Sequence, residues 1–158
     1  MMFQANDGAV SERRDWMELL ARAPLAMLEN WMLGAGENGP LPGRIWLRKP
    51  ETGLAMLRAR AGGAGERFNL GEVTLTRSTL RIETGEVGVA YVRGRSQRKA
   101  ELAAFADALL QSAPWRDAVR RRLIEPVRAH LEAETARARH KAQATRVEFL
   151  TLAREVGQ

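Results

Sequence analysis

The chain has 158 residues, enough for one domain with a substantial core, and its 45% hydrophobic content argues against wholesale disorder. It has no cysteine and two histidines, which excludes disulfides, iron–sulfur ligation and cysteine nucleophiles and disfavours a histidine-based metal site. The net charge of +6 comes mainly from 22 arginines, which suit nucleic acid, nucleotides or an acidic protein surface.

The N-terminal quarter predicts a tail, two helices and a loop. We expect residues 1–10 to be a disordered tail and residues 11–158 to form a single domain. Ser11 is a candidate cap for a first helix, Pro24 suits the first turn of a second, and the Gly and Pro content of 34–43 predicts a loop. The sequence shows no apolar run near the roughly 20 residues of a membrane span and no secretory signal, so we expect a cytoplasmic protein.

The middle of the chain predicts an antiparallel sheet, because the connections between its strands are short. The segment KPETG (49–53) is typical of a hairpin turn. Leu75 and Leu80 differ in parity, so we expect a bulge or bend near Arg77–Thr79. The alternating patterns predict strands over 44–49, 54–60, 72–77, 79–83 and 86–94.

The remainder predicts helices. Ser96 is a candidate cap for a helix through about Gln111, and its inward residues are Leu102, Phe105, Ala106 and Leu109. Pro114 and Pro126 each suit the start of a further helix, the last one long. The seam of this last helix is Val127, Leu131, Thr135, Ala138, Ala142, Thr145, Phe149, Leu152 and Val156. The predicted fold class is α+β: a small antiparallel sheet of about four strands packed with N-terminal helices and a long C-terminal helix.

The segment ARAGGAGERFNLGEVTLTR (59–77) has three glycines within four positions, at Gly62, Gly63 and Gly65. The spacing is not a Rossmann fingerprint, because Phe68 stands where the third glycine belongs and no helix follows. It is not a P-loop either, since no Gly-Lys-Ser/Thr occurs. Two interpretations stay open: a constrained connection between strands, and a backbone nest for an anion.

Arginines surround this segment, and on adjacent antiparallel strands several can converge on one face. Such a cluster suits a triphosphate, a phosphonate or the carboxylates of a partner, and the alternative is a solvated sheet face. The arginines concerned are Arg58, Arg60, Arg67, Arg77, Arg81, Arg93 and Arg95.

Three other features give weaker evidence of a functional site. Arg116, Arg120–Arg122 and Arg128 form a basic helical patch, but no nucleic-acid-binding motif accompanies it. His130 and His140 are ten residues apart on one predicted helix, so they cannot share a metal within it. Glu66 and Glu72 are too ordinary a pair to name as acid and base.

Three segments resemble one family. The runs ETGLAMLRARAGGAGERFNLGEVTLTR (51–77), GEVGVAYVRGR (85–95) and ATRVEFLTLAR (144–154) are similar to PhnG, the G subunit of the bacterial carbon–phosphorus lyase core complex, and RRDWMELLARA (13–23) resembles its start. The resemblance implies a non-catalytic or accessory subunit of a transferase in phosphonate catabolism. In that reaction an alkylphosphonate displaces adenine from ATP and gives a ribose 1-alkylphosphonate 5-triphosphate.

The resemblance also implies partners: H, I and J subunits in a core complex, with ATP-binding-cassette-type K and L subunits. ATP is then the substrate of the complex, and the iron–sulfur cluster and S-adenosylmethionine belong to a partner subunit, with no cofactor in this chain. The alternative function is a basic nucleic-acid-binding or other small interaction protein, although nucleic acid is not the expected partner, and neither is a membrane. Catalytic residues stay unknown and no metal ligands are expected. The candidate anion-binding or subunit-interface residues are Arg58, Arg60, Gly62, Gly63, Gly65, Glu66, Arg67, Glu72, Thr74, Thr76 and Arg77.

Overall fold

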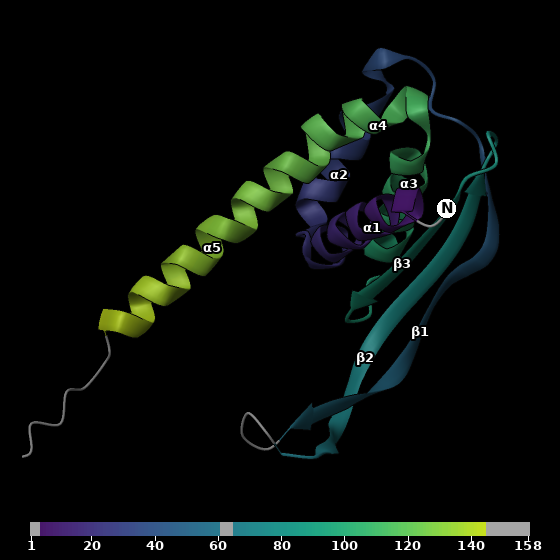
Figure 1. Cartoon of the computed structure of the whole chain (residues 1–158). Coiled ribbons are helices and arrows are strands. Elements are labelled where there is room, and N and C mark those ends of the chain that lie inside the picture. The colour runs from purple at the N-terminus through teal and green to yellow at the C-terminus, as the bar shows by residue number, and fades with distance from the viewer. Residues whose placement is uncertain (1–3, 61–64, 145–158) are drawn as a thin grey trace, which may run out of the picture.

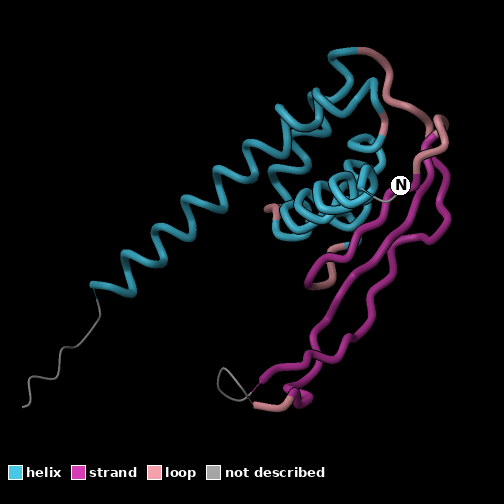
Figure 2. The backbone as a smooth tube through the Cα atoms, viewed as in Figure 1, coloured by secondary structure: helices cyan, strands magenta, loops and turns pink. Residues whose placement is uncertain are grey.

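A computed structural model describes residues 4–60 and 65–144 of this chain. The helices lie on one side of a three-stranded antiparallel sheet in the order β1-β2-β3, as Figures 1 and 2 show. This arrangement confirms the predicted α+β class. The elements are α1 (Gln4–Arg22), α2 (Leu25–Gly34), the 3-10 helix η1 (Ala35–Asn38), β1 (Arg44–Arg60), β2 (Arg67–Ile82), β3 (Val87–Arg93), α3 (Gln97–Gln111), α4 (Ala113–Val119), the π-helical turn η2 (Arg120–Ile124) and α5 (Glu125–Ala144).

The described sheet has three strands rather than the predicted four or so, because predicted strands join. Segments 44–49 and 54–60 are both part of β1, so KPETG is not a turn. Pro50 is tolerated there because β1 is an edge strand, where a missing amide hydrogen breaks no central ladder. Segments 72–77 and 79–83 likewise merge into β2, which begins at Arg67.

The predicted irregularity near Arg77–Thr79 lies at that level of the sheet but in the neighbouring strand. Arg48 pairs with Thr79 and Glu51 with Arg77, so Lys49 and Pro50 together stand against one residue of β2. The register between β2 and β3 is unbroken from Leu75 to Arg81. The parity of β2 does not change, because two hydroxyl residues occupy its core face. The buried residues of that face are Thr76, Ser78, Leu80 and Ile82.

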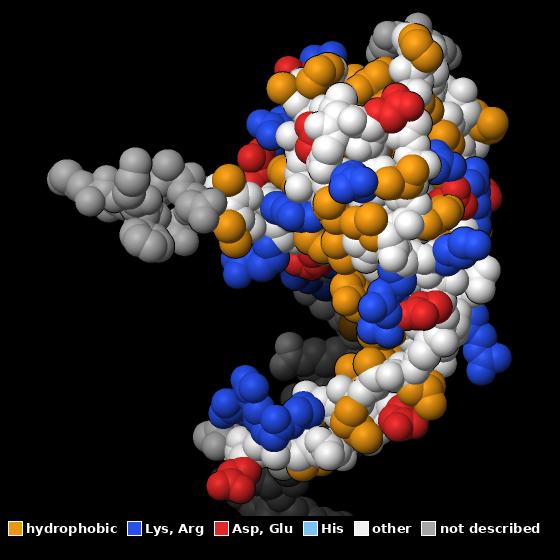
Figure 3. Space-filling view, turned by 90° about the vertical axis from the view of Figure 1, so that its right-hand side faces the viewer, with side chains coloured by type: hydrophobic (Ala, Val, Ile, Leu, Met, Phe, Trp, Pro, Cys, Tyr) orange, Lys and Arg blue, Asp and Glu red, His pale blue; other side chains and the backbone are white. Residues whose placement is uncertain are grey.

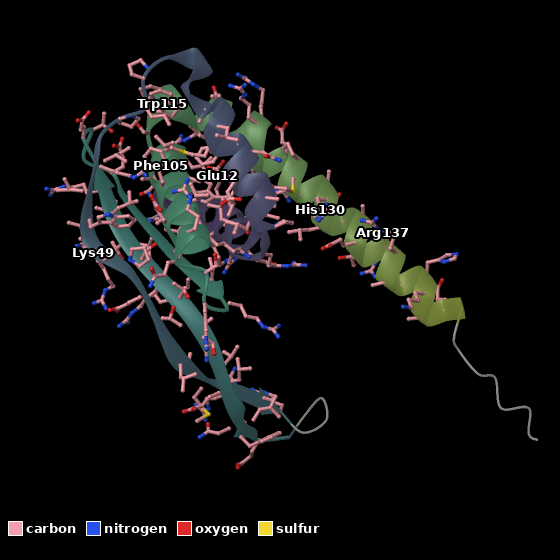
Figure 4. The ribbon with its side chains drawn as sticks, turned by 180° about the vertical axis from the view of Figure 1, so that it is seen from behind. Glu12, Lys49, Phe105, Trp115, His130 and Arg137 are labelled. Carbon is pink, nitrogen blue, oxygen red and sulfur yellow. The ribbon has the colours of Figure 1, made fainter. Side chains whose placement is uncertain are left out.

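The central helix α3 is capped as predicted: the Ser96 side chain accepts a hydrogen bond from the Lys99 amide. All four predicted inward residues are buried, and so is every residue from Leu102 to Leu110. The helix is enclosed because the sheet packs on one side and α1 and α2 on the other; Figure 4 labels Phe105 in this layer. Alanine makes close packing possible, and a Cβ on Gly88 of β3 would overlap the Ala104 carbonyl oxygen.

The other predicted helix boundaries are partly confirmed. Pro24 caps α2 and Pro114 lies in the first turn of α4. The first helix begins at Gln4 rather than at Ser11, so helix covers most of the segment that composition marked as a tail. Segment 34–43, predicted to be a loop, contains the 3-10 helix η1.

The chain does not break at Pro126, because the π turn at Arg120–Ile124 joins α4 to α5 without a loop. A π turn is wider than an α turn and is a common local irregularity where a helix continues through such a position. Of the predicted seam, Val127 and Leu131 are buried, and Thr135, Ala138 and Ala142 are exposed where α5 leaves the body (Figure 1). Thr145, Phe149, Leu152 and Val156 lie outside the described residues.

Candidate functional site

β1 and β2 continue beyond β3 as a two-stranded arm. We define the arm as Leu54–Arg60 of β1 and Arg67–Thr74 of β2, which pair from Leu54 with Thr74 to Arg60 with Arg67. β3 pairs with β2 only between Leu75 and Arg81. The arm therefore projects away from the helices, as Figure 1 shows. A two-stranded ribbon has little stability in water without further packing, so an arm of this length favours a partner surface.

Three of the predicted arginines gather at the end of the arm. Arg60 lies directly opposite Arg67, and Arg58 lies opposite Asn69. Figure 3 shows basic side chains clustered at this end of the molecule. All three arginines are exposed, and no ion pair links them to another described residue. Like charges directly opposite each other destabilise a strand pair, so this cluster is suited to an external anion or carboxylate.

The glycine motif is only partly described. Gly65 is half-buried and Glu66 is exposed, immediately before β2 begins. Gly62 and Gly63 lie outside the described residues, so the choice between a constrained connection and an anion nest stays open.

The arm also exposes large apolar side chains, which the sequence reasoning missed. Leu70 is 62% exposed and Leu54 66%, and Met56, Leu57 and Phe68 are exposed as well. Apolar residues gathered on an exposed element mark an interaction surface more often than residues scattered singly. The apolar residues of segment 54–60 could have indicated this surface, but only if the segment is known to lie outside the core.

The other predicted site residues lie closer to the body. Thr76 is buried and donates to the Gly94 carbonyl at 2.7 Å, and Arg77 bonds Glu51 at 2.7 Å. Thr74 is half-buried and Glu72 is exposed. Arg77 is ten residues from Arg67 on β2, which is about 33 Å along an extended strand. The predicted cluster therefore separates into a basic end on the arm and a structural group at its base.

Glu51 holds two arginines on the outer face of the sheet. Its carboxylate accepts from Arg48 at 2.6 Å and from Arg77 at 2.7 Å. These hydrogen bonds, first from Arg48 and then from Arg77, hold the pKa of Glu51 below its ordinary value of 4.5. Arg77 is consequently a member of a surface ion-pair network with Glu51 and Arg48.

A buried carboxylate that the sequence reasoning did not select joins three elements. Asp107 of α3 has no exposed side-chain surface and accepts from Arg13 at 2.7 Å and from Trp16 Nε1 at 2.8 Å, both on α1. It also accepts from the Val89 amide of β3 at 2.9 Å. Because its oxygens are engaged by protein donors, Asp107 is a structural group that fixes α1 and β3 on α3.

The basic helical patch is largely committed to contacts within the chain. Arg116 donates to the Leu110 carbonyl at 2.8 Å, Arg120 pairs with Glu12, and Arg122 donates to the Gly34 carbonyl at 3.0 Å. These contacts tie the α4–α5 junction to α1, α2 and α3. They leave fewer cations free for a nucleic-acid backbone than the sequence count indicates.

Neither histidine belongs to a metal centre in the described part of the chain. His130 lies 3.4 Å from Glu134 one turn along α5, and His140 is exposed; Figure 4 shows His130 on α5 beside the other helices. Among the described residues no group of three or more His, Asp or Glu side chains is placed to hold a metal ion. Within residues 4–60 and 65–144, no helix is both long and apolar enough to cross a membrane.

The fold and the arm define a small α+β protein whose distinctive surface is an exposed basic and apolar ribbon. A family model described as "Phosphonate metabolism protein PhnG" matches residues 11–155. The chain is also 45% identical over 150 residues, covering 95% of this chain and 94% of the relative, to "Alpha-D-ribose 1-methylphosphonate 5-triphosphate synthase subunit PhnG" of Rhizobium meliloti (strain 1021). The chain therefore belongs to the PhnG family of phosphonate metabolism proteins, which confirms the resemblance found in the sequence.

Proposed function

We propose that this chain is the PhnG subunit of a ribose 1-methylphosphonate 5-triphosphate synthase, and that it contributes by assembly rather than by chemistry. The single observation that carries this proposal is the 45% identity along nearly all of both chains. The exposed arm supports the assembly role, because its apolar and basic surface lacks a covering element in the described structure.

The reaction proposed for the complete enzyme is displacement of adenine from ATP by an alkylphosphonate. This chain contributes no cofactor to it, and the iron–sulfur cluster and S-adenosylmethionine of the pathway belong to a partner. The proposed partners are the H, I and J subunits of a core complex, with the K and L subunits associated, in the cytoplasm. A single domain spanning residues 11–158 is part of the same proposal.

We consider two roles for the arginines of the arm. In the first, Arg58, Arg60 and Arg67 pair with carboxylates of a neighbouring subunit. In the second, they hold the triphosphate or phosphonate at a subunit boundary. The geometry favours the first, because exposed apolar residues accompany the arginines along the arm and a phosphate site needs none of them.

The test is to produce the complete set of subunits with and without this chain and to measure adenine release from ATP and methylphosphonate. We expect release from the complete set, with no release from this chain alone and none when it is omitted. Adenine release by the isolated chain would contradict the accessory role. Full activity of the set that lacks it would contradict the assignment as a required subunit.

A nucleic-acid-binding role is the second candidate, and the net charge of +6 is the observation that favours it. Phosphate contacts predict an affinity that falls steeply with salt. A filter-binding titration at low salt is expected to show no binding, and retention of DNA or RNA that is lost as salt rises would favour this alternative.

A further inference from the structure

β3 is an edge strand of the sheet, and its outward main-chain groups can be identified. The Gly94 amide bonds the Thr74 carbonyl and the Ile82 amide bonds the Glu86 carbonyl, so even-numbered residues on this side face β2. Since main-chain groups alternate along a strand, the odd-numbered residues Val87, Val89, Tyr91 and Arg93 direct theirs away from the sheet.

The first part of this edge is closed by side chains. The Val87 carbonyl accepts from Arg13 at 3.1 Å and from Gln111 at 2.9 Å, and the Val89 amide donates to Asp107. These side chains occupy the positions that a neighbouring strand would otherwise take, which is how proteins protect an edge from unwanted pairing.

The second part of the edge is open. The carbonyl of Val89, both main-chain groups of Tyr91 and the amide of Arg93 have no hydrogen-bond partner among the described residues. Tyr91 is 53% exposed. The side chains that cover the edge reach only as far as the Val89 amide. Strand pairing is therefore blocked along the first part of β3 and not along the second.

An apolar groove of about 680 Å³ lies alongside this open segment, between α1 and β3. Its floor includes Ala103 of α3, and the α1 side is formed mainly by Val10, Met17 and Ala21. Val89 and Tyr91 form the β3 side. A strand laid along β3 would place alternate side chains at this groove, because side chains repeat with a period of two.

The charges near the groove are basic. Arg14 lines it and Arg93 follows it on β3; both are exposed, and neither forms an ion pair with a described residue. Glu18, which also lines the groove, is already paired with Arg22 at 3.2 Å. The unpaired charge beside the open edge is therefore positive, and it complements an acidic segment.

From these observations we propose that the open edge Val89–Arg93 and the adjoining groove bind an extended segment of a partner subunit. The segment adds a fourth strand to the sheet, with apolar side chains at alternate positions toward α1 and with carboxylates near Arg14 and Arg93. Five residues span about 13 Å between their ends. A strand of this length buries too little surface for a stable interface alone, so it acts together with the arm.

This inference rests on the proposed function, which supplies the partner. The test compares main-chain amide exchange in the free chain with exchange in the assembled synthase. We expect the amides of Tyr91 and Arg93 to exchange freely in the isolated chain and to slow by about 100-fold or more in the complex. The Val89 amide, bonded to Asp107 in both states, is the internal reference.

Two variants separate the main chain from the side chain. Tyr91→Pro removes the outward donor at a position where an edge strand tolerates proline, and we expect it to weaken assembly about tenfold. Tyr91→Ala keeps the amide and is expected to weaken assembly less. Thermal unfolding of both free variants shows whether they fold. If Tyr91→Pro does not fold, the exchange measurement on the unaltered chain still decides whether a strand is added at this edge.

The outcomes are distinct. If the complex assembles but Tyr91 and Arg93 exchange as fast as in the free chain, the strand addition is wrong while the proposed function stands. If no complex assembles, the proposed function is wrong and the strand addition is overturned with it. If the isolated chain self-associates with these amides protected, the edge belongs to a second copy and the partner segment is excluded.

Discussion

Asp107 joins the helical layer to the sheet through one buried carboxylate. Its carboxylate is buried, receives Arg13 and Trp16 from α1 and the Val89 amide from β3, and so joins segments 18 to 94 residues away in sequence. Burying a carboxylate is unfavourable unless it is paired and fully hydrogen-bonded, and both conditions hold here.

Asp107→Asn is expected to destabilise the protein by about 3 kcal/mol, because the amide cannot accept all of these donors and leaves Arg13 without its counter-charge. Urea unfolding of the purified chain measures this loss. Asp117→Asn, an exposed change on α4, is the matched control and should stay within about 0.5 kcal/mol. An equal effect of the two variants would show that the buried network is not important for stability.

Gly88 sets the distance between β3 and α3. An added Cβ would overlap the Ala104 carbonyl oxygen and lie 2.8 Å from the Ala108 nitrogen, both of them helix backbone that cannot move aside locally. Gly88→Ala is therefore expected to destabilise by about 3 kcal/mol in the same unfolding experiment. Gly53→Ala on β1, where nothing lies within 4 Å, is the control, and it should leave the midpoint nearly unchanged.

Glu51 makes the stability of the protein depend on pH. Its pKa is lower in the folded protein than its ordinary value of 4.5, so its contribution to stability is present above 4.5 and is lost as pH falls through the folded-state pKa. We expect the stability difference between the protein and Glu51→Gln to shrink as pH is lowered from 6 to about 3. A difference that is constant over this range in parallel unfolding curves would exclude the Arg48 and Arg77 contacts as its cause.

At the scale of elements, the arm is the feature that distinguishes this fold. Its exposed apolar residues contribute little to the free chain, because they are not packed on the core. They become important only when another chain covers them. The arm is thus expected to influence assembly without influencing folding.

Changing both Phe68 and Leu70 to Ser is expected to leave the free energy of unfolding of the isolated chain within about 0.5 kcal/mol of the original. The same double variant should weaken assembly with the other subunits by tenfold or more, because these side chains reach full burial only at an interface. Leu33→Ser on α2, also highly exposed, is the control. If the double variant and Leu33→Ser affect co-purification equally, the arm is not a specific contact.

The elements that the sequence predicted well are those specified locally. Ser96, Pro24 and Pro114 each mark a helix start through its own side chain or ring. The strands were divided wrongly because pairing between β1 and β2 overrides the turn propensity of residues 49–53. Asp107 could not be selected because its partners are distant in sequence, and an isolated aspartate in an alanine-rich helix forms no recognisable motif.

At the scale of the whole molecule, β3 with its groove and the arm are two separate surfaces that lack a covering element in the described structure. The proposed function supplies a reason for such surfaces, because a subunit of a complex packs against other chains. The motif 59–77 was recognisable from sequence as a family mark. The position of its described residues 67–74 on a projecting ribbon was not, since periodicity does not reveal whether a strand reaches beyond its sheet.

The most direct measurement combines assembly and turnover for the variant in which Arg58, Arg60 and Arg67 are all alanine. The fraction of chain in the complex is read by sedimentation, and adenine release is divided by the amount of complex. If the arm is a subunit contact, affinity for the other subunits falls tenfold or more, while release per assembled complex stays within about twofold. Normal assembly with a much lower rate per complex would contradict this account and place the arginines at the substrate.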